Sequence, residues 1–287
     1  MKINLLQCGY CNGRESVVLK GGRKTKLVFP ALVGLLQHPV HGNILFDTGY
    51  SERFYEVTAK WPEKITAWLL PTFVKPEESA LNQLKAMGIE AETVNYIIVS
   101  HFHVDHICGL KDFPNAKFVC SAAALDNVLK SKGFSSISKG VMPGLIPSDM
   151  AQRSWIFDTD AKVSQENDEI LGTIYDLFGD GSIKIVELPG HHNGQIGVIL
   201  KDEKGDPLFL CADVCWLSDS YRENRLPSSI TKLLITDWKT YKNSIDKVHH
   251  FYKKHPEIPI IPTHCLKAIG ELRVQKPEYF ECWKSTW

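Results

Sequence analysis

The chain has 287 residues, of which 44% are hydrophobic and 10% aromatic, so it is long and apolar enough to bury a sizeable core. Its 33 basic residues balance 33 acidic ones, which excludes the strong positive field of a nucleic-acid-binding protein and favours a small-molecule partner. Polar residues at 12–15 interrupt the N-terminus before the apolar core of a signal peptide could form, and no apolar run of about 18 residues follows that could span a membrane. The eight cysteines are scattered, which suits reduced thiols. We therefore expect a cytoplasmic location without stable membrane association.

Short apolar segments recur along the chain and read as strands. They are residues 2–7, 31–37, 43–47, 95–100, 116–120, 183–188, 195–200, 207–212 and 258–262. Amphipathic segments at residues 76–88, 121–131 and 237–255 read as helices, the first with Pro76 near its start and Gly88 at its end. Because single helices separate strands in both halves, we expect an α+β fold of two sheets with helices packed outside.

The stretch 132–180 differs from the rest because Gly, Ser, Pro and Asp interrupt it repeatedly. We expect one domain over residues 1–287, in which this stretch is an irregular insertion or a connection between the halves. A solvated linker and a lid over the substrate are both compatible with its composition.

Residues 101–106, His-Phe-His-Val-Asp-His, follow directly on the apolar run 96–100. Side chains two apart in an extended segment point the same way, so His101 and His103 can share one metal ion. Asp105 and His106 come where the following Cys-Gly pair indicates a turn, and a change of direction would aim them towards a second ion. This density of imidazole and carboxylate groups predicts a metal site.

Three further candidate ligands stand at the ends of strand-like runs, namely His191, Asp213 and His264. Polar residues at the carboxyl ends of several strands are how many folds of this class build a site, since the loops there converge on a rigid sheet. Taken alone, His191 or Asp213 could be an ordinary turn or cap residue. Together with residues 101–106, we expect all three to bind metal.

The order of these motifs resembles the metallo-β-lactamase superfamily. The resemblance spans roughly residues 30–265 and rests on Asp47-Thr48-Gly49, residues 101–106, Pro189-Gly190-His191, Asp213 and His264. It implies a four-layer αβ/βα sandwich with a dinuclear metal site along one edge. It further implies that His101, His103 and His191 hold one ion, that Asp105, His106 and His264 hold the other, and that Asp213 bridges both. Asp47 would brace the ligand loop, although a plain turn residue is the alternative.

Nitrogen and oxygen ligands without a thiolate suit two zinc ions, with iron, manganese or cobalt as alternatives. Two such ions can share a hydroxide, because they lower the pKa of bound water towards about 7. Asp105 could then pass a proton to the leaving group. The sequence therefore predicts a metal-dependent hydrolase that acts on an ester or lactone bond of a small, partly apolar substrate.

Within the superfamily, the N-acyl homoserine lactonase branch is the most similar, on the segments 213–216, 221–224 and 273–279. Trp216 stands where that branch has a tyrosine that contacts substrate, and its indole can donate a hydrogen bond but cannot act as an acid. Tyr221 is a second candidate substrate contact. His192 is either an exposed turn residue, which loop composition favours, or a polar contact near the metals.

Residues 61–74 are more apolar than a surface loop requires. They could form buried core, a contact of a homodimer, or a pocket wall for an acyl chain, and the last possibility makes Trp68 a candidate substrate contact. The remaining histidines lack ligand spacing, and we expect them at the surface: His38, His41, His249, His250 and His255.

Two other enzyme functions compete with ester or lactone hydrolysis. The same ions could hydrolyse thioesters or phosphoesters, but phosphate recognition needs basic residues near the site, and only Lys111, Arg222 and Arg225 are candidates. A di-iron redox protein is the other alternative. His103 argues against it, because the flavo-diiron branch of the superfamily, which the chain also resembles, has a carboxylate at that position.

Overall fold

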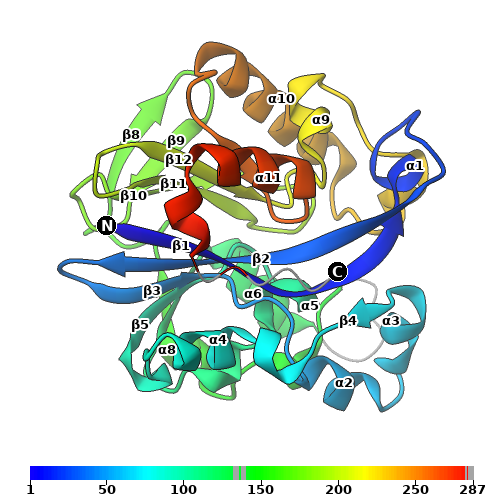
Figure 1. Cartoon of the computed structure of the whole chain (residues 1–287), viewed down its shortest axis with the longest axis horizontal. Helices are drawn as coiled ribbons and strands as arrows, with labels where there is room; N and C mark the ends of the chain where they lie inside the picture. The colour runs from blue at the N-terminus through cyan, green and yellow to red at the C-terminus, as the bar shows by residue number, and fades with distance from the viewer. Residues whose placement is uncertain (132–135, 137–139, 282, 284–287) are drawn as a thin grey trace.

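Two β-sheets lie face to face in the computed structural model, which describes residues 1–131, 136, 140–281 and 283. Helices α9 (Ser218–Arg222), α10 (Trp238–Lys254) and α11 (Leu266–Gln275) lie over one sheet, and α4 (Ala80–Ala86), α6 (Ala122–Lys130) and α8 (Met150–Arg153) over the other (Figure 1). This arrangement confirms the predicted α+β fold of four layers, αβ/βα.

The first sheet has seven strands in the order β4-β1-β2-β3-β5-β6-β7. Their bounds are β1 (Lys2–Arg14), β2 (Lys26–His38), β3 (Gly42–Phe46), β4 (Thr72–Phe73), β5 (Val94–Ile98), β6 (Lys117–Cys120) and β7 (Ser154–Ile156). β3, β5, β6 and β7 run parallel to one another, whereas β1, β2 and β3 are antiparallel.

The second sheet has six strands in the order β13-β12-β11-β10-β9-β8. Their bounds are β8 (Ser164–Asp168), β9 (Gly172–Asp176), β10 (Ile183–Glu187), β11 (Ile196–Lys201), β12 (Pro207–Ala212) and β13 (Ile260–Pro262). Only the β12–β13 pair is parallel. Alternate residues of both sheets point inwards: Ile44 and Phe46 meet Ile185 in the core between the sheets, while Leu45 and Val186 pack under the helices.

Polar caps and apolar stripes explain the longer helices. Ser79, Ser121 and Asp237 accept hydrogen bonds from backbone N–H groups at the starts of α4, α6 and α10. The predicted helix 76–88 begins as a 3-10 turn and continues as α4.

The shorter elements are α1 (Glu15–Val18), α2 (Arg53–Thr58), α3 (Lys64–Leu69), α5 (Val104–Ile107), η1 (Pro76–Glu78), η2 (Ala91–Thr93), η3 (Leu110–Asp112), η4 (Pro143–Leu145), η5 (Ser229–Leu233) and η6 (Pro277–Phe280).

The carboxyl ends of β3, β5, β12 and β13 lead directly into the candidate site residues. Asp47 follows β3 with φ +61°, and Ala212 at the end of β12 has φ +49°. A non-glycine residue in the left-handed region costs free energy, and such residues are concentrated at functional sites. Here the two unusual conformations turn the chain sharply at the point where each strand delivers an aspartate.

Every strand expected from the sequence is present, but β1 extends seven residues beyond its expected end and β2 begins five residues before its expected start. Strands β4, β7, β8 and β9 were not expected. Three of them fall in the stretch 132–180, of which residues 132–135 and 137–139 lie outside the described part. The chain leaves the first sheet at β7 and enters the second at β8. We therefore retain as a proposal that this stretch connects the halves of one domain, residues 1–287.

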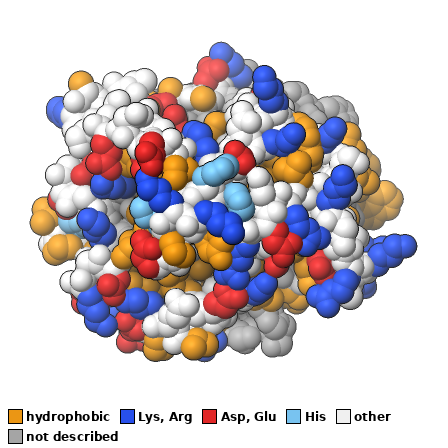
Figure 2. Space-filling view, turned by 90° about the horizontal axis from the view of Figure 1, so that it is seen from above, with side chains coloured by type: hydrophobic (Ala, Val, Ile, Leu, Met, Phe, Trp, Pro, Cys, Tyr) orange, Lys and Arg blue, Asp and Glu red, His pale blue; other side chains and the backbone are white. Residues whose placement is uncertain are grey.

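The surface of the described residues carries exposed apolar side chains at residues 61–69. Trp68 on α3 is 86% exposed, and Trp61 is 70% exposed. Of the three alternatives for residues 61–74, buried core therefore does not apply to these two side chains, whereas Val74 at the end of the segment is buried. Elsewhere, basic and acidic side chains are interspersed over the face seen in Figure 2.

No described helix is long and apolar enough to cross a membrane. The seven described cysteines are buried and free, and Cys282 lies outside the described residues.

Candidate metal centre

The segment 101–106 leaves β5 and changes direction at the start of α5. His101 and His103 precede the helix, and Asp105 and His106 lie on its single turn. This is the change of direction that the sequence analysis expected, although its form is a helical turn. The backbone of the turn is tied to the neighbouring loop, since Thr48 donates through its N–H and its hydroxyl to the carbonyl of His106.

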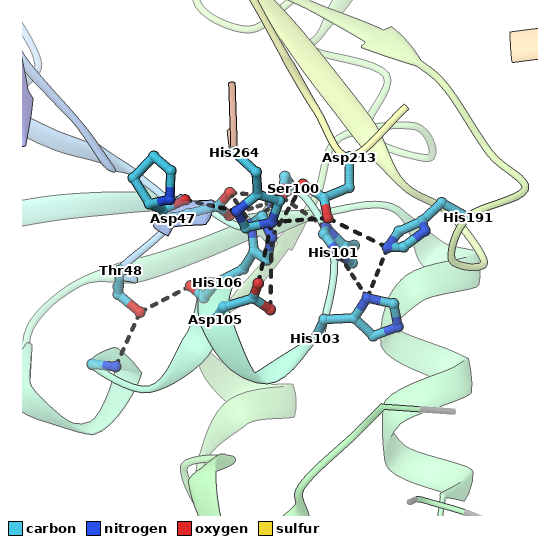
Figure 3. Close-up of polar contacts among 12 residues, drawn as sticks. Asp47, Thr48, Ser100, His101, His103, Asp105, His106, His191, Asp213 and His264 are labelled. Carbon is cyan, nitrogen blue, oxygen red and sulfur yellow. Dashed lines mark hydrogen bonds and ion pairs between the residues drawn. The ribbon is translucent and has the colours of Figure 1, made fainter. Parts of the chain in front are cut away.

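One group of three imidazoles converges beside this turn. Nε2 of His101 lies 3.0 Å from Nδ1 of His103, which lies 2.9 Å from Nε2 of His191 (Figure 3). His191 comes from the loop between β10 and β11. The three nitrogen atoms are therefore close enough to hold one metal ion.

A second group is formed by Asp105, His106, Asp213 and His264. Nε2 of His264 lies 3.2 Å from Oδ2 of Asp105 and 3.1 Å from Oδ2 of Asp213. Nε2 of His106 lies 3.5 Å from Oδ1 of Asp213. Asp213 also lies 3.5 Å from Nε2 of His191, so this carboxylate stands between the two groups. The structure thus brings together all seven residues that the sequence analysis selected as ligands.

Three nitrogen atoms that face away from the centre contact partners, most of which were not expected from the sequence, whereas Nδ1 of His191 has no hydrogen-bond partner among the described residues. Ser100 Oγ lies 3.0 Å from Nδ1 of His101 and donates to Asp47 Oδ2 at 2.6 Å. Asp47 Oδ2 lies 2.7 Å from Nδ1 of His106. Nδ1 of His264 donates to the carbonyl of Pro30 at 2.7 Å. Asp47 and Ser100 therefore both contact the segment that carries the candidate ligands, where we propose that they brace it.

The two groups differ in the charge that they favour. Burial, together with the neighbouring imidazoles, holds the pKa of His101 and His103 well below the usual range, and burial lowers the pKa of His191 to about 4. Burial also opposes protonation of His106, but the carboxylates around it, Asp47 first, raise its pKa to about 10. The first group therefore presents neutral imidazoles, whereas the second holds protons that a cation can replace.

The described residues fit a bound metal. His106 Nε2 and Asp213 Oδ1 are buried and have no hydrogen-bond partner within the described chain, although an unpaired buried polar atom is costly. Both atoms belong to the second group of ligand atoms. A divalent cation would satisfy both, and the donor set of imidazole and carboxylate suits zinc and similar ions.

Trp216 and Tyr221, both expected near the substrate, are placed differently. The indole Nε1 of Trp216 donates to Asp213 Oδ2 at 3.1 Å, so it reaches the metal centre. Tyr221 is buried, and its hydroxyl donates to the carbonyl of Ile260 at 3.0 Å while its ring contacts Tyr252. These contacts turn Tyr221 into the core beneath α10, so we no longer expect it to touch substrate.

His38 was expected at the surface, and that expectation is wrong. For His192, the exposed turn residue that loop composition favoured is wrong, and its position supports the alternative of a polar residue near the metal ligands. His192 is completely buried, with its ring 5.1 Å from that of His103. His38 is buried at the end of β2 and forms a third imidazole–carboxylate group with His41 and Asp180. Nδ1 of His38 accepts from the backbone N–H groups of Val40 and His41, so its proton is on Nε2, which faces Asp180. These hydrogen bonds fix the His38 ring at the end of β2, and we assign His38 a structural role.

Sequence and structure comparisons agree on the kind of protein that this chain resembles. A family model described as the metallo-beta-lactamase superfamily matches residues 27–248. An N-acyl homoserine lactonase AttM of Agrobacterium fabrum is 24% identical over 282 residues, which cover 98% of each chain. An N-acyl homoserine lactonase of a Bacillus species is 25% identical over 65% of this chain and 64% of its own.

Solved structures show the same fold. An N-acyl homoserine lactone hydrolase with N-hexanoyl-L-homoserine bound at its catalytic metal centre superposes with a TM-score of 0.73 at 20% identity, covering 94% of this chain and 95% of that one. The hydrolase AbOPH superposes with a TM-score of 0.62 at 17% identity, covering 93% and 87%. At these identities the likeness describes the fold.

Proposed function

Since the chain belongs to the metallo-beta-lactamase superfamily, we propose that this metal-dependent hydrolase cleaves an ester or lactone bond of a small, partly apolar molecule of the N-acyl homoserine lactone class. The observation that carries the proposal is the pair of ligand groups that share Asp213. His101, His103 and His191 would hold one ion, and Asp105, His106 and His264 the other. Two zinc ions are the cofactor that we propose, with iron, manganese or cobalt as alternatives.

When bound, such a pair of ions activates water at neutral pH and polarises the carbonyl under attack. Asp105 has the geometry of a proton carrier in this reaction. Its side chain is 12% exposed, against 4% or less for the other three members of the second group, so it is the member that incoming molecules can reach. Burial opposes its ionisation, but His106 and His264 outweigh burial and lower its pKa to about 2.

We propose that Asp105 accepts a proton from the attacking water and delivers it to the leaving group. In a lactone, the water oxygen bonds to the carbonyl carbon, the ring C–O bond breaks, and the leaving oxygen takes the proton as an alcohol. The ring-opened product is an N-acyl amino acid. No redox partner is needed, because no atom changes oxidation state.

The lactone class is supported by the relatives, which include N-acyl homoserine lactonases that align over nearly the whole chain. Phosphoester hydrolysis is less well supported, because the candidate basic residues are engaged elsewhere. Lys111 donates to the carbonyl of Gly144, Arg222 pairs with Glu271, and Arg225 pairs with Glu223. The balance of 33 basic and 33 acidic residues also gives no support to a nucleic-acid substrate.

Three expectations from the sequence stay predictions: the cytoplasmic location, the homodimer and the contact of Trp68 with substrate. The exposed apolar side chains of residues 61–69 are compatible with a dimer contact and with an acyl-chain wall. A homodimer predicts twice the chain mass in light scattering, and a chain mass of one protomer would contradict it.

The function is tested by offering homoserine lactones, aryl esters, thioesters and phosphodiesters to the zinc-loaded protein. We expect the highest kcat/KM for an acylated homoserine lactone. Asp105→Asn, in the same metal-loaded state, should lose that activity. A preference for thioesters or phosphodiesters would refute the substrate class, and full turnover by the variant would refute the role of Asp105.

A further inference from the structure

His192 lies against the ligand histidines of the first group without belonging to it. Its ring centroid is 5.1 Å from that of His103, with the two planes at 83°, and 5.7 Å from that of His101. The side chain is fully buried. An imidazole is an expensive group to bury, so its position calls for an account of what it contacts.

Hydrogen bonds fix the orientation of the His192 ring. Nδ1 lies 2.9 Å from the carbonyl oxygen of Asn193, and because a carbonyl can only accept, Nδ1 carries a proton. Nε2 is then the acceptor for the side-chain Nδ2 of Asn127, 3.2 Å away on α6. The ring is thus tied at one nitrogen to its own loop and at the other to a helix.

The loop that carries His192 is itself held between α6 and α10. Gly190 has φ +122° and lies so close to the backbone of Tyr241 that a Cβ atom there would overlap it. Gly194 has φ +68°, its carbonyl accepts from Ser121 Oγ at 2.9 Å, and a Cβ on it would meet the N–H of Ala124 at 2.5 Å. Such close packing leaves the loop little freedom to shift.

The ring of His103 is confined from a second direction by the backbone at Gly140. A Cβ atom on Gly140 would lie 2.5 Å from Cδ2 and 2.8 Å from Nε2 of His103. His103 offers its Nδ1 to the first ligand group, so any rotation of the ring would move that atom away from His101 and His191. Gly140 and His192 therefore restrict the His103 ring. The orientation of this ring determines whether the three nitrogen atoms of the first group are close enough to bind one metal ion.

We propose that His192, anchored by Asn127, is a positioning residue that holds the imidazole of His103 ready to bind the first metal. The proposal rests on the proposed dinuclear centre. Residues that orient a ligating histidine commonly contribute about 10–100-fold to metal affinity, because the ligand loses less freedom when the metal binds. His192 touches neither metal nor substrate in this account and acts through His103.

The test is a stepwise zinc titration in competition with a chromophoric chelator, on the full chain and on His192→Ala. We expect one of the two dissociation constants to rise about 10–100-fold and the other to change less than about threefold. His249→Ala is the control, since it truncates another hydrogen-bonded histidine, which belongs to none of the candidate ligand groups. Thermal unfolding of both variants separates lost stability from lost affinity.

Asn127→Ala provides a gentler variant and a double-mutant cycle. If Asn127 acts through His192, its removal weakens zinc binding in the unaltered chain but has no further effect in His192→Ala. Additive effects would overturn the proposal, as would unchanged zinc affinity or equal weakening of both sites in His192→Ala. Those results would refute the role of His192 without affecting the proposed dinuclear centre. Failure of the unaltered chain to bind zinc would refute both the dinuclear centre and the role of His192.

Discussion

Replacing Asp47 by Asn tests how far the metal centre depends on a residue that does not bind metal. The buried carboxylate of Asp47 accepts hydrogen bonds from Ser100 N–H at 2.7 Å, from Ser100 Oγ at 2.6 Å and from His106 Nδ1 at 2.7 Å. The amide of Asn can keep two of these, because its oxygen still accepts from the Ser100 N–H and its nitrogen can donate to the hydroxyl. It cannot accept from His106 Nδ1–H.

The loss is therefore one charge-assisted hydrogen bond to a ligating imidazole, worth about 1.5–3 kcal/mol. Converted at 1.4 kcal/mol for each factor of ten, this predicts a zinc dissociation constant raised roughly 10- to 150-fold for the site that contains His106. Chelator competition measures this constant directly. Asp202→Asn is the matched control, because Asp202 is another buried carboxylate that accepts hydrogen bonds, from the Tyr279 hydroxyl and the Lys204 N–H, outside the centre. A change below about threefold in Asp47→Asn would refute the reasoning.

Three further predictions address the centre itself. Asp105→Asn should lower kcat by about 10²–10⁴-fold with the fold intact by circular dichroism, because it removes the proposed proton carrier, and unchanged kcat would contradict that role. Zinc binding at pH 7 should release protons and tighten with rising pH, since the pKa of His106 in the metal-free chain is about 10 and the ion needs the neutral ring. Calorimetry in two buffers of different ionisation enthalpy measures the release, and identical heats would argue against it. Trp216→Phe removes the hydrogen bond from the indole to Asp213 and should weaken zinc binding about tenfold. A raised KM for the lactone with unchanged zinc affinity would instead favour a direct contact of Trp216 with substrate.

The ligands could be predicted from the sequence because each follows an apolar strand. Asp213 follows directly on the run 207–212, and His264 comes two residues after the run 258–262. The candidate ligands therefore stand at strand ends, which the fold brings together. Strand β12 is almost wholly buried, which is why its apolar pattern is unambiguous. The helix α10 was equally clear, with Asp237 as its cap and buried Tyr241, Ile245 and Val248 on one stripe.

The elements that sequence missed have little pattern of their own. Strand β8, Ser164–Asp168, is polar and largely exposed, and it exists because it pairs with β9 in a hairpin. Strand β4 has two residues and is defined by its pairing with β1. Such strands are set by tertiary pairing rather than by local hydrophobic alternation.

The partners of the ligands were also hidden, for a related reason. His192 stands in a Gly-rich turn sequence that is typical of an exposed loop, and only the packing of α6 and α10 against that loop buries it. The bond from His264 to the carbonyl of Pro30 joins residues 234 positions apart, and a backbone carbonyl carries no sequence signal. Asp47 was expected from the Asp-Thr-Gly motif. Among the partners that were not expected, Ser100 had a visible clue, because it is the polar residue between a buried strand and His101.

The proposed hydrolysis requires that this chain hold two metal ions in the groups that share Asp213. The most direct measurement is the metal content of the purified native protein, by mass spectrometry of the metals against protein concentration. We predict two ions per chain, with a fall to one or none in Asp213→Ala. A native content of one ion or none per chain, under conditions where zinc is supplied, would contradict the account.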